Sequence, residues 1–494
     1  GLKGDKISEP NPNEYQDDKV AVHSDDEVPS IAIIPLKNKG DDRDTFYAYG
    51  ISADLITDCS SSGLIRVESL DRIEKIENHD KLDITELVSK LSVRYVATGT
   101  LWKMDDIFQL SIELYDTKQS KIVWSDRWQE DWDNLSTIKL NLSDGFLKAM
   151  DIKSIIKKKV DTTNTKAYEF YLKGKYRFEK RKNSEDSEIA RGFLKKAIEL
   201  DDNLIIAKIW LAWTYFFLGD YNKAMETHKQ SLKQAKELCD KQGIGFSLNG
   251  IGSCYLGKRE YDKALDYFQR SLDIGYEIDD KLRIAGSLSN IGNIYKEKGD
   301  YDKALDYNRR TIKIREEYGE ITQIGSWFSI SGGINLLKGD YDKALENLNS
   351  ALERKEGIDV NWLAWLYYNL GYYYVLNNEN EKAIVYLEKS LSIQNEIDEK
   401  ENISATSCLL YLSYKRIGQE YDENEVYQFF KEKELEYDYY TNYSLYQLLE
   451  DTNYMKTAYN QVQELADNLE PNVADKFLSY PIPKAIVEEW EKVK

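Results

Sequence analysis

The seven-residue phrase Gly299-Asp300-Tyr301-Asp302-Lys303-Ala304-Leu305 decides the fold of this chain, because it returns at a fixed interval. Four related phrases with the same Lys-Ala pair stand at 219–225, 259–265, 339–345 and 378–384. The alanines of the five phrases are Ala224, Ala264, Ala304, Ala344 and Ala383, which are separated by steps of 40, 40, 40 and 39 residues. Equal steps are typical of a solenoid, in which each unit buries its apolar face against its neighbours.

Each phrase is the centre of a helix–turn–helix unit. Twelve residues before the alanine stands a small residue, which is Ala212, Gly252, Gly292, Gly332 or Gly371. A small side chain lets a neighbouring helix approach closely, and a tyrosine usually follows it three residues later. The Gly-Asp pair ends the first helix, because Gly tolerates positive φ and Asp accepts hydrogen bonds from the free N–H groups of the next helix.

This unit resembles the tetratricopeptide repeat, a family pattern with small residues at its eighth and twentieth positions. The usual repeat has about 34 residues, whereas the unit here has 40. The resemblance runs from Ala207 to Glu401, with a degenerate repeat beginning at Ala167 and a further repeat ending at Lys433. It implies an all-α superhelix over residues 165–435 that binds extended or helical peptides in its groove.

Residues 30–150 predict a small mixed α/β domain, and residues 1–29 and 151–164 predict linkers. The expected order is strand, helix, strand, helix, three strands and a last helix capped by Asp133. The expected strands are Ser30–Leu36, Leu64–Glu68, Tyr95–Leu101, Ile107–Tyr115 and Lys121–Asp126, and the expected helices are Asp44–Cys59, Ile84–Leu91 and Asn134–Met150.

The same region resembles the TolB-like domain of bacterial signalling proteins. The resemblance rests on the segments Ser30–Asn38, Phe46–Ile56, Val93–Leu101, Leu110–Asp116 and Val123–Trp128. It implies a domain without catalytic activity of its own that precedes tetratricopeptide repeats. Such domains follow a class III nucleotide cyclase, a winged-helix DNA-binding domain or a protein kinase.

The two ends of the chain carry shorter resemblances. Gly1-Leu2-Lys3-Gly4, with Ser8-Glu9-Pro10 and Tyr15, resembles the tail that closes class III cyclase domains. An ordinary acidic linker is the alternative interpretation, and the sequence leaves both open. The segment Lys476–Ile486, followed by Trp490, is similar to the end of repeat-bearing cyclases, so residues 436–494 predict a helical cap over the last repeat.

The composition argues against several classes of partner. A net charge of −20 disfavours nucleic acid and anionic lipid, since both require a basic face. No apolar run has membrane-spanning length and no signal peptide is visible. The four cysteines are scattered and predict buried thiols of a reduced compartment, hence a cytoplasmic location.

The sequence offers no catalytic, metal or cofactor motif on which to predict an enzyme. It lacks a phosphate-binding loop and a nucleophile elbow. His228 falls four residues after the repeat alanine, where other units have Phe268, Asn308, Leu348 and Leu387, which predicts a packing role. We therefore expect no cofactor, and any cyclase activity would belong to a domain before Gly1.

A ligand of the repeats is expected on the first helix of each unit, at the family's inward positions. Aromatic rings anchor side chains and amides bond a peptide backbone, so a protein or peptide partner is predicted. The alternative is that several of these residues are core, or are covered by residues 402–494. The predicted groove residues are Ile209, Trp213, Phe216, Phe246, Asn249, Ser289, Asn293, Lys296, Ser329, Trp365, Tyr368 and Tyr372.

The sequence therefore predicts a multidomain chain: a small mixed α/β, TolB-like domain, an all-α repeat solenoid and a C-terminal helical cap. The first functional hypothesis is a binding scaffold within a bacterial signalling protein. The second is the regulatory region of a class III adenylate or guanylate cyclase, which would form a homodimer through its upstream domain. The third is the regulatory region of a winged-helix transcriptional regulator, whose upstream domain would carry a basic recognition helix.

Overall fold

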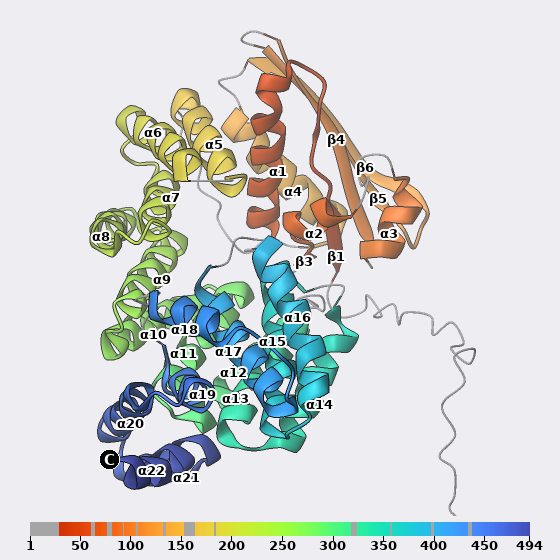
Figure 1. Cartoon of the computed structure of the whole chain (residues 1–494). Coiled ribbons are helices and arrows are strands. Elements are labelled where there is room, and N and C mark those ends of the chain that lie inside the picture. The colour runs from red at the N-terminus through yellow and green to blue at the C-terminus, as the bar shows by residue number, and fades with distance from the viewer. Residues whose placement is uncertain are drawn as a thin grey trace, which may run out of the picture.

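The computed structural model combines a small α/β unit with an array of paired helices (Figure 1). The α/β unit, at the red and orange end of the colour scale, lies beside helices from both halves of the array. The residues that the structure describes are 29–60, 65–76, 82–91, 93–104, 107–131, 135–152, 164–181, 184–317, 324–355, 358–396, 400–432 and 437–494. The predicted cap Asp133, residues 1–28 of the predicted linker 1–29 and residues 153–163 of the predicted linker 151–164 lie outside these ranges.

The α/β unit is built on one mixed sheet with the strand order β3-β1-β4-β5-β6. Strand β1 runs parallel to β3 and β4, whereas β4, β5 and β6 are antiparallel neighbours. A short strand β2, which the sequence analysis missed, pairs with β4. The strands are β1 (Ser30–Ile33), β2 (Lys37–Asn38), β3 (Arg66–Val67), β4 (Tyr95–Met104), β5 (Ile107–Asp116) and β6 (Lys121–Asp131).

Both faces of this sheet are covered, because the side chains of β1 alternate between two apolar clusters. Ile31 and Ile33 pack with helices α1 (Thr45–Ser60) and α4 (Leu135–Ala149). Ala32 packs on the other face with α2 (Leu70–Lys75) and α3 (Ile84–Leu91). Helix α2 and the 3₁₀ helix η1 (Asp42–Asp44) were not predicted; the other described elements of this unit follow the predicted order.

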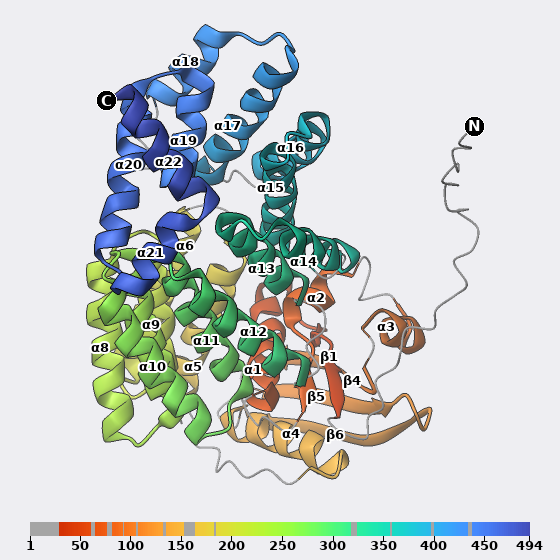
Figure 2. The same cartoon turned by 90° about the horizontal axis from the view of Figure 1, so that it is seen from below.

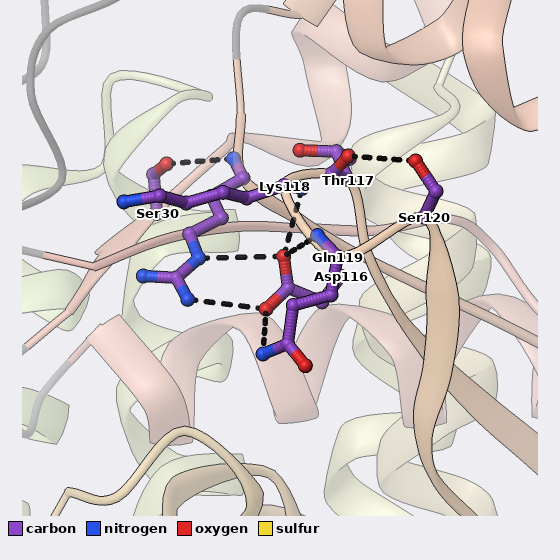
Figure 3. A network of polar contacts seen from close by, with 7 residues as sticks. Ser30, Asp116, Thr117, Lys118, Gln119 and Ser120 are labelled. Atoms are coloured by element: carbon purple, nitrogen blue, oxygen red, sulfur yellow. Dashed lines mark hydrogen bonds and ion pairs between the residues drawn. The ribbon is translucent and has the colours of Figure 1, made fainter.

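The turn between β5 and β6 is held by the buried carboxylate of Asp116 (Figure 3). Its oxygens accept hydrogen bonds from the backbone N–H groups of Lys118 and Gln119 at 2.8 and 3.2 Å, and from Nη2 of Arg94 at 3.1 Å. Burial favours the neutral acid, but these donors outweigh it and lower the pKa of Asp116. The burial of this carboxylate is explained by its structural role, which is to close the turn between β5 and β6.

The remainder of the chain is a series of helical hairpins, which confirms the predicted helix–turn–helix unit. The first helices of the hairpins are α5 (Thr165–Glu179), α7 (Ile205–Phe216), α9 (Lys241–Gly257), α11 (Lys281–Glu297), α13 (Ile324–Lys338), α15 (Val360–Leu376) and α17 (Lys400–Ile417). The second helices are α6 (Ser184–Leu200), α8 (Tyr221–Glu237), α10 (Tyr261–Glu277), α12 (Tyr301–Glu317), α14 (Tyr341–Glu353), α16 (Asn380–Glu396) and α18 (Glu423–Glu432).

The repeated small residues allow the two helices of a unit to touch, as the sequence predicts. A Cβ added to Gly332 would lie 2.6 Å from Leu348, and one added to Gly371 would lie 2.5 Å from Leu387. The alanine of each phrase is fully buried in the same contact. Any larger side chain at these positions would force the helices of the unit apart.

The turn inside each unit uses the left-handed conformation that the Gly-Asp pair predicts. Gly219 has φ +76°, and the side chain of Asp220 accepts a hydrogen bond from the backbone N–H of Lys223. Two units make the same turn without glycine: Arg259 has φ +59° and Asn378 has φ +60°. Asparagine tolerates this conformation, whereas arginine adopts it at a steric cost.

The C-terminal helices fold back onto earlier units (Figure 2). They are α19 (Tyr439–Leu449), α20 (Thr452–Asp467), α21 (Pro471–Ser479) and α22 (Pro481–Val493). The hydroxyls of Tyr301 and Tyr439 are 2.5 Å apart, and Phe477 lies against the turn at Gly299. Pro481 lies against Gly339 in the same way. This segment therefore contacts the turns of two central units, beyond the last repeat that it was predicted to cover.

Candidate binding surface on the first helices

The predicted groove residues fall into three groups, and the central group contains the two that are exposed, Phe246 and Asn293. At the N-terminal end, Ile209 is 3% exposed and packs with Ile205 and Ala235. Trp213 is half-buried, edge-on to Phe216 at 5.2 Å between ring centroids and to His228 at 5.5 Å. Ile209 is thus a core residue, which corrects its prediction as a groove residue, because α7 turns that side toward α8 and α9.

The C-terminal end of the predicted groove is occupied by the chain itself. Tyr368 and Tyr372 are each 5% exposed, and the ring of Tyr372 lies 6.1 Å from that of Tyr440 on α19. Burial raises the pKa of both tyrosines well above its usual range. Ser329 is fully buried, and its hydroxyl lies 3.5 Å from the amide of Asn369. The prediction that these three residues face a ligand is corrected, because α19 and neighbouring helices cover them.

The central group lies on α9 and α11 and presents polar side chains. Asn293 is exposed and Ser289 is half-buried. The side chain of Asn249 accepts a hydrogen bond of 3.0 Å from Nδ2 of Asn290, which ties the two helices together. The ring of Phe246 is 37% exposed. This is the part of the surface that a partner can reach.

Lys296 closes this group toward α15. Its Nζ lies 3.0 Å from a carboxylate oxygen of Glu297 and 6.0 Å from the ring centroid of Trp365, which stacks on Tyr368. Desolvation disfavours the charged form, but Glu297 and Asp438 outweigh it and raise the pKa of Lys296. The lysine therefore remains a cation among aromatic and acidic neighbours.

A cleft of about 390 Å³ lies where the α/β unit meets the first helices. The repeats contribute Phe246 and Asn249 from α9 and the N-terminal half of α11. The other wall consists of Ile56, Thr57 and Ser60 of α1, together with Arg66, Val67, Glu68 and Ser69 around β3. Phe246 and Asn249 were predicted from their positions in the repeat, whereas the opposite wall was not, since no pattern in the sequence pairs the two units.

Arg283 is the functional candidate that sequence reasoning missed. It lines this cleft, is only 8% exposed, and its guanidinium carbon lies 4.2 Å from the ring centroid of Phe246. Its ion pair with Asp280 measures 3.3 Å, and burial lowers the pKa of Arg283 against the opposing effect of that carboxylate. In the sequence, the one indication of such a residue was a charged side chain between the apolar Leu282 and Ile284.

Buried polar contacts dock the α/β unit on the first repeat. The carboxylate of Asp54 on α1 accepts hydrogen bonds from the hydroxyls of Tyr168 and Tyr171 at 2.5 and 3.1 Å, and from Nζ of Lys175 at 2.9 Å. Gly50 meets Leu172 so closely that an added Cβ would lie 2.7 Å away. A further ion pair at 3.0 Å joins Lys75 on α2 to Asp359 before α15. The unit thus contacts two distant parts of the array.

Among the described residues, no helix is both long and apolar enough to cross a lipid bilayer. Nor do three or more histidine, cysteine, aspartate or glutamate side chains in this part of the chain come together as a metal site.

Comparison with known families supports the repeat assignment. The sequence model of the tetratricopeptide repeat matches residues 204–277, 244–317 and 326–396. Residues 26–144 match a different model, described as the second domain of HilA/YgeH-like transcriptional regulators, which the sequence analysis did not name. The TolB-like resemblance and the cyclase context stay predictions. No curated protein matches the chain.

Several solved structures share the helical repeats at low identity. Aspartyl phosphate phosphatase F from Bacillus subtilis is 17% identical over 61% of this chain and 83% of its own, with a TM-score of 0.45. BtubC from P. vanneervenii is 18% identical over 44% of this chain and 91% of its own, with a TM-score of 0.38. YrrB, a TPR protein with an unusual peptide-binding site, is 22% identical over 41% of this chain and 92% of its own, with a TM-score of 0.28.

Proposed function

We propose that this chain is a non-catalytic scaffold that binds a protein or peptide partner on the first helices of its tetratricopeptide repeats. The observation that carries the proposal is the polar surface on α9 and α11, where Asn293 is exposed beside Lys296. Covered surfaces on either side, at Ile209 and at Tyr368, limit the partner to this central region. The partner would therefore contact two or three units.

The chemistry of this surface suits a peptide backbone. Amide side chains donate and accept hydrogen bonds, so Asn249, Asn290 and Asn293 can pair with the N–H and C=O groups of an extended segment. Lys296 adds one cation for an acidic group of the partner. The exposed ring of Phe246 at the edge of the surface can contact an apolar side chain.

The test is selection of a random peptide library on the immobilised full chain, followed by affinity measurements on the selected peptides. The double variant Asn293→Ala/Lys296→Ala should weaken binding by about tenfold or more, the loss expected for one or two hydrogen bonds to charged or amide groups. The matched control Asn347→Ala/Lys313→Ala removes the same residue types from second helices, where Asn347 is half-buried and Lys313 is exposed. Equal affinity of the two variants, or no enriched peptide, would refute the proposal.

A second candidate function follows from the match of residues 26–144 to a domain of transcriptional regulators. In that case the scaffold is the regulatory region of a DNA-binding protein, and a basic recognition helix would stand before Gly1. The resemblance of Gly1-Leu2-Lys3-Gly4 to the tail of class III cyclase domains supports the cyclase alternative instead, with metal-binding aspartates in the upstream domain. Reading the codons upstream of Gly1 separates the two, because a winged helix and a cyclase core share no motif.

A further inference from the structure

We propose that the cleft between the α/β unit and helices α9 and α11 binds a small monocarboxylate with an apolar body, and that Arg283 pairs with its carboxylate. This site adjoins the partner surface around Asn293, with which it shares Phe246 and Asn249, and it takes a small molecule where that surface takes a peptide. Its walls come from both structural units.

The state of Arg283 is the first observation. Its side chain is 4% exposed, and neither Nε nor Nη2 has a hydrogen-bond acceptor among the residues that the structure describes. These two nitrogens lie on one edge of the guanidinium, the edge that matches the two oxygens of a carboxylate. Burying guanidinium N–H groups without hydrogen-bond acceptors costs free energy. An anion that accepts hydrogen bonds from Nε and Nη2 would remove that cost.

The neighbouring acid does not supply these hydrogen bonds. Asp280 is the N-cap of α11, and its Oδ1 accepts the backbone N–H of Arg283 at 3.0 Å. Its Oδ2 lies 3.3 Å from Nη2, which is an ion pair but not a hydrogen bond of good geometry. Arg283 is held in place by the ring of Phe246 and the backbone of Gly245, against which its guanidinium packs.

The rest of the lining defines the body of the ligand. Ile56 and Val67 from the α/β unit face Phe246 and Leu282 from the repeats, so the space beside the arginine is apolar. A cleft of about 390 Å³ is at the lower end of the range for small-molecule sites. The ligand is thus an acid with one ring or a short alkyl chain.

The charge of the lining favours a monoanion over a phosphate dianion. Arg66 is already paired with Glu68 at 3.0 Å, and Glu68 also accepts a hydrogen bond from Arg72 at 2.8 Å. The carboxylates of Glu68 and Asp280 both line the cleft and would repel a second negative charge. Among the described residues of the lining, Arg283 is the cation that would pair with an entering anion, because its Nε and Nη2 lack a hydrogen-bond acceptor even though its charge is shared with Asp280.

Because the ligand would touch both walls, its binding would stabilise the docking of the α/β unit on the repeats. The cleft would then report the presence of a carboxylic acid through the arrangement of the two units. This coupling does not depend on any peptide bound near Asn293.

The experiment measures binding of 3-phenylpropanoate to the full chain by calorimetry, with 3-phenylpropanamide and phenyl phosphate as comparison probes. The Arg283→Met variant keeps the apolar packing on Phe246 but removes the charge, and Arg283→Lys keeps the charge but loses the two-nitrogen edge. Arg270→Met is the matched control, since Arg270 also lies over an aromatic ring, at 4.9 Å from Tyr267, but away from the cleft. Circular dichroism checks that each variant is folded.

The proposal expects saturable binding of the carboxylate, at least tenfold weaker binding in Arg283→Met, an intermediate affinity in Arg283→Lys and an unchanged affinity in Arg270→Met. It is overturned if 3-phenylpropanoate does not bind, if the amide or the phosphate binds as well, or if Arg283→Met binds equally. The Asn293→Ala/Lys296→Ala variant should keep carboxylate binding, so the peptide surface and this cleft succeed or fail separately.

Discussion

The buried imidazole of His228 makes the stability of the second repeat depend on pH. The side chain on α8 is fully buried, it lies edge-on to Trp213, and neither ring nitrogen has a hydrogen-bond partner among the described residues. An added Cβ on Gly250 would lie 2.3 Å from the ring, so α9 packs directly against the imidazole. This burial lowers the pKa of His228 to about 3.

The sign and size of the effect follow from proton linkage. In the unfolded chain the histidine binds a proton below about pH 6.5, whereas in the folded chain it remains neutral until about pH 3. The unfolded state therefore binds more protons in that window, and stability falls as the pH is lowered. Between pH 7.5 and pH 5 the loss is about 2 kcal/mol, since each pH unit below 6.5 costs about 1.4 kcal/mol.

Hydrogen exchange of α8 and α9 measures this loss locally. Relative to the His228→Leu variant, the parent chain should lose about thirtyfold of its amide protection on going from pH 7.5 to pH 5, after correction for intrinsic exchange rates. Leucine is the matched replacement, because Leu348 and Leu387 occupy the equivalent buried position in later units. If the two proteins lose protection equally, His228 titrates near its usual pKa and the reasoning is wrong.

Three further predictions concern packing and docking. Asp54→Asn should destabilise the contact between the α/β unit and α5 by about 2–4 kcal/mol, because it leaves the buried Lys175 without its carboxylate partner. Amide hydrogen exchange in α1 and α5 should then be faster than in the control variant Asp42→Asn, which changes an exposed aspartate. Gly371→Val should cost about 1–3 kcal/mol through overpacking against Leu387, visible as a lower midpoint of urea unfolding, and an unchanged midpoint would contradict the helix contact. Arg259→Gly should raise the free energy of unfolding by about 0.5–1 kcal/mol, and with it the urea midpoint, because it relieves left-handed strain. Asn378→Gly should change the midpoint little.

Local sequence patterns predicted the units of this fold well, because each unit is determined by short-range rules. The step of 40 residues, the small residue that faces Leu348 or Leu387 and the left-handed turn at Gly219 all act within one hairpin. The helix Ile84–Leu91 was predicted with its observed bounds for the same reason. Elements of two residues, such as β2 and β3, were missed or overextended, since a strand so short has no periodicity to detect.

Contacts between segments that are distant in the sequence determine which residues of the candidate site are exposed. The repeat pattern does not predict these contacts. Of the residues that position in the unit predicted for the groove, Phe246 and Asn293 are exposed and Asn249 is half-buried, and their role in binding stays a prediction. The same rule failed for Tyr368 and Tyr372, because Tyr440 and its helix cover them from 68 or more residues further along the chain. Arg283 is not at an inward family position at all, and its role depends on a wall contributed by α1 and β3.

The arrangement of the three segments favours a local binding surface on the repeats. The α/β unit is docked on α5 through Asp54 and reaches α15 through Lys75, while α19 is fixed to α12 through the Tyr301–Tyr439 contact. Each docking buries aromatic or charged groups that would otherwise be solvated, so neither segment leaves the array without a cost in free energy. A partner of the size of the full superhelix would have to displace both. A short peptide at α9 and α11 displaces neither, and this difference in cost is the physical reason to expect a small, local ligand on this scaffold.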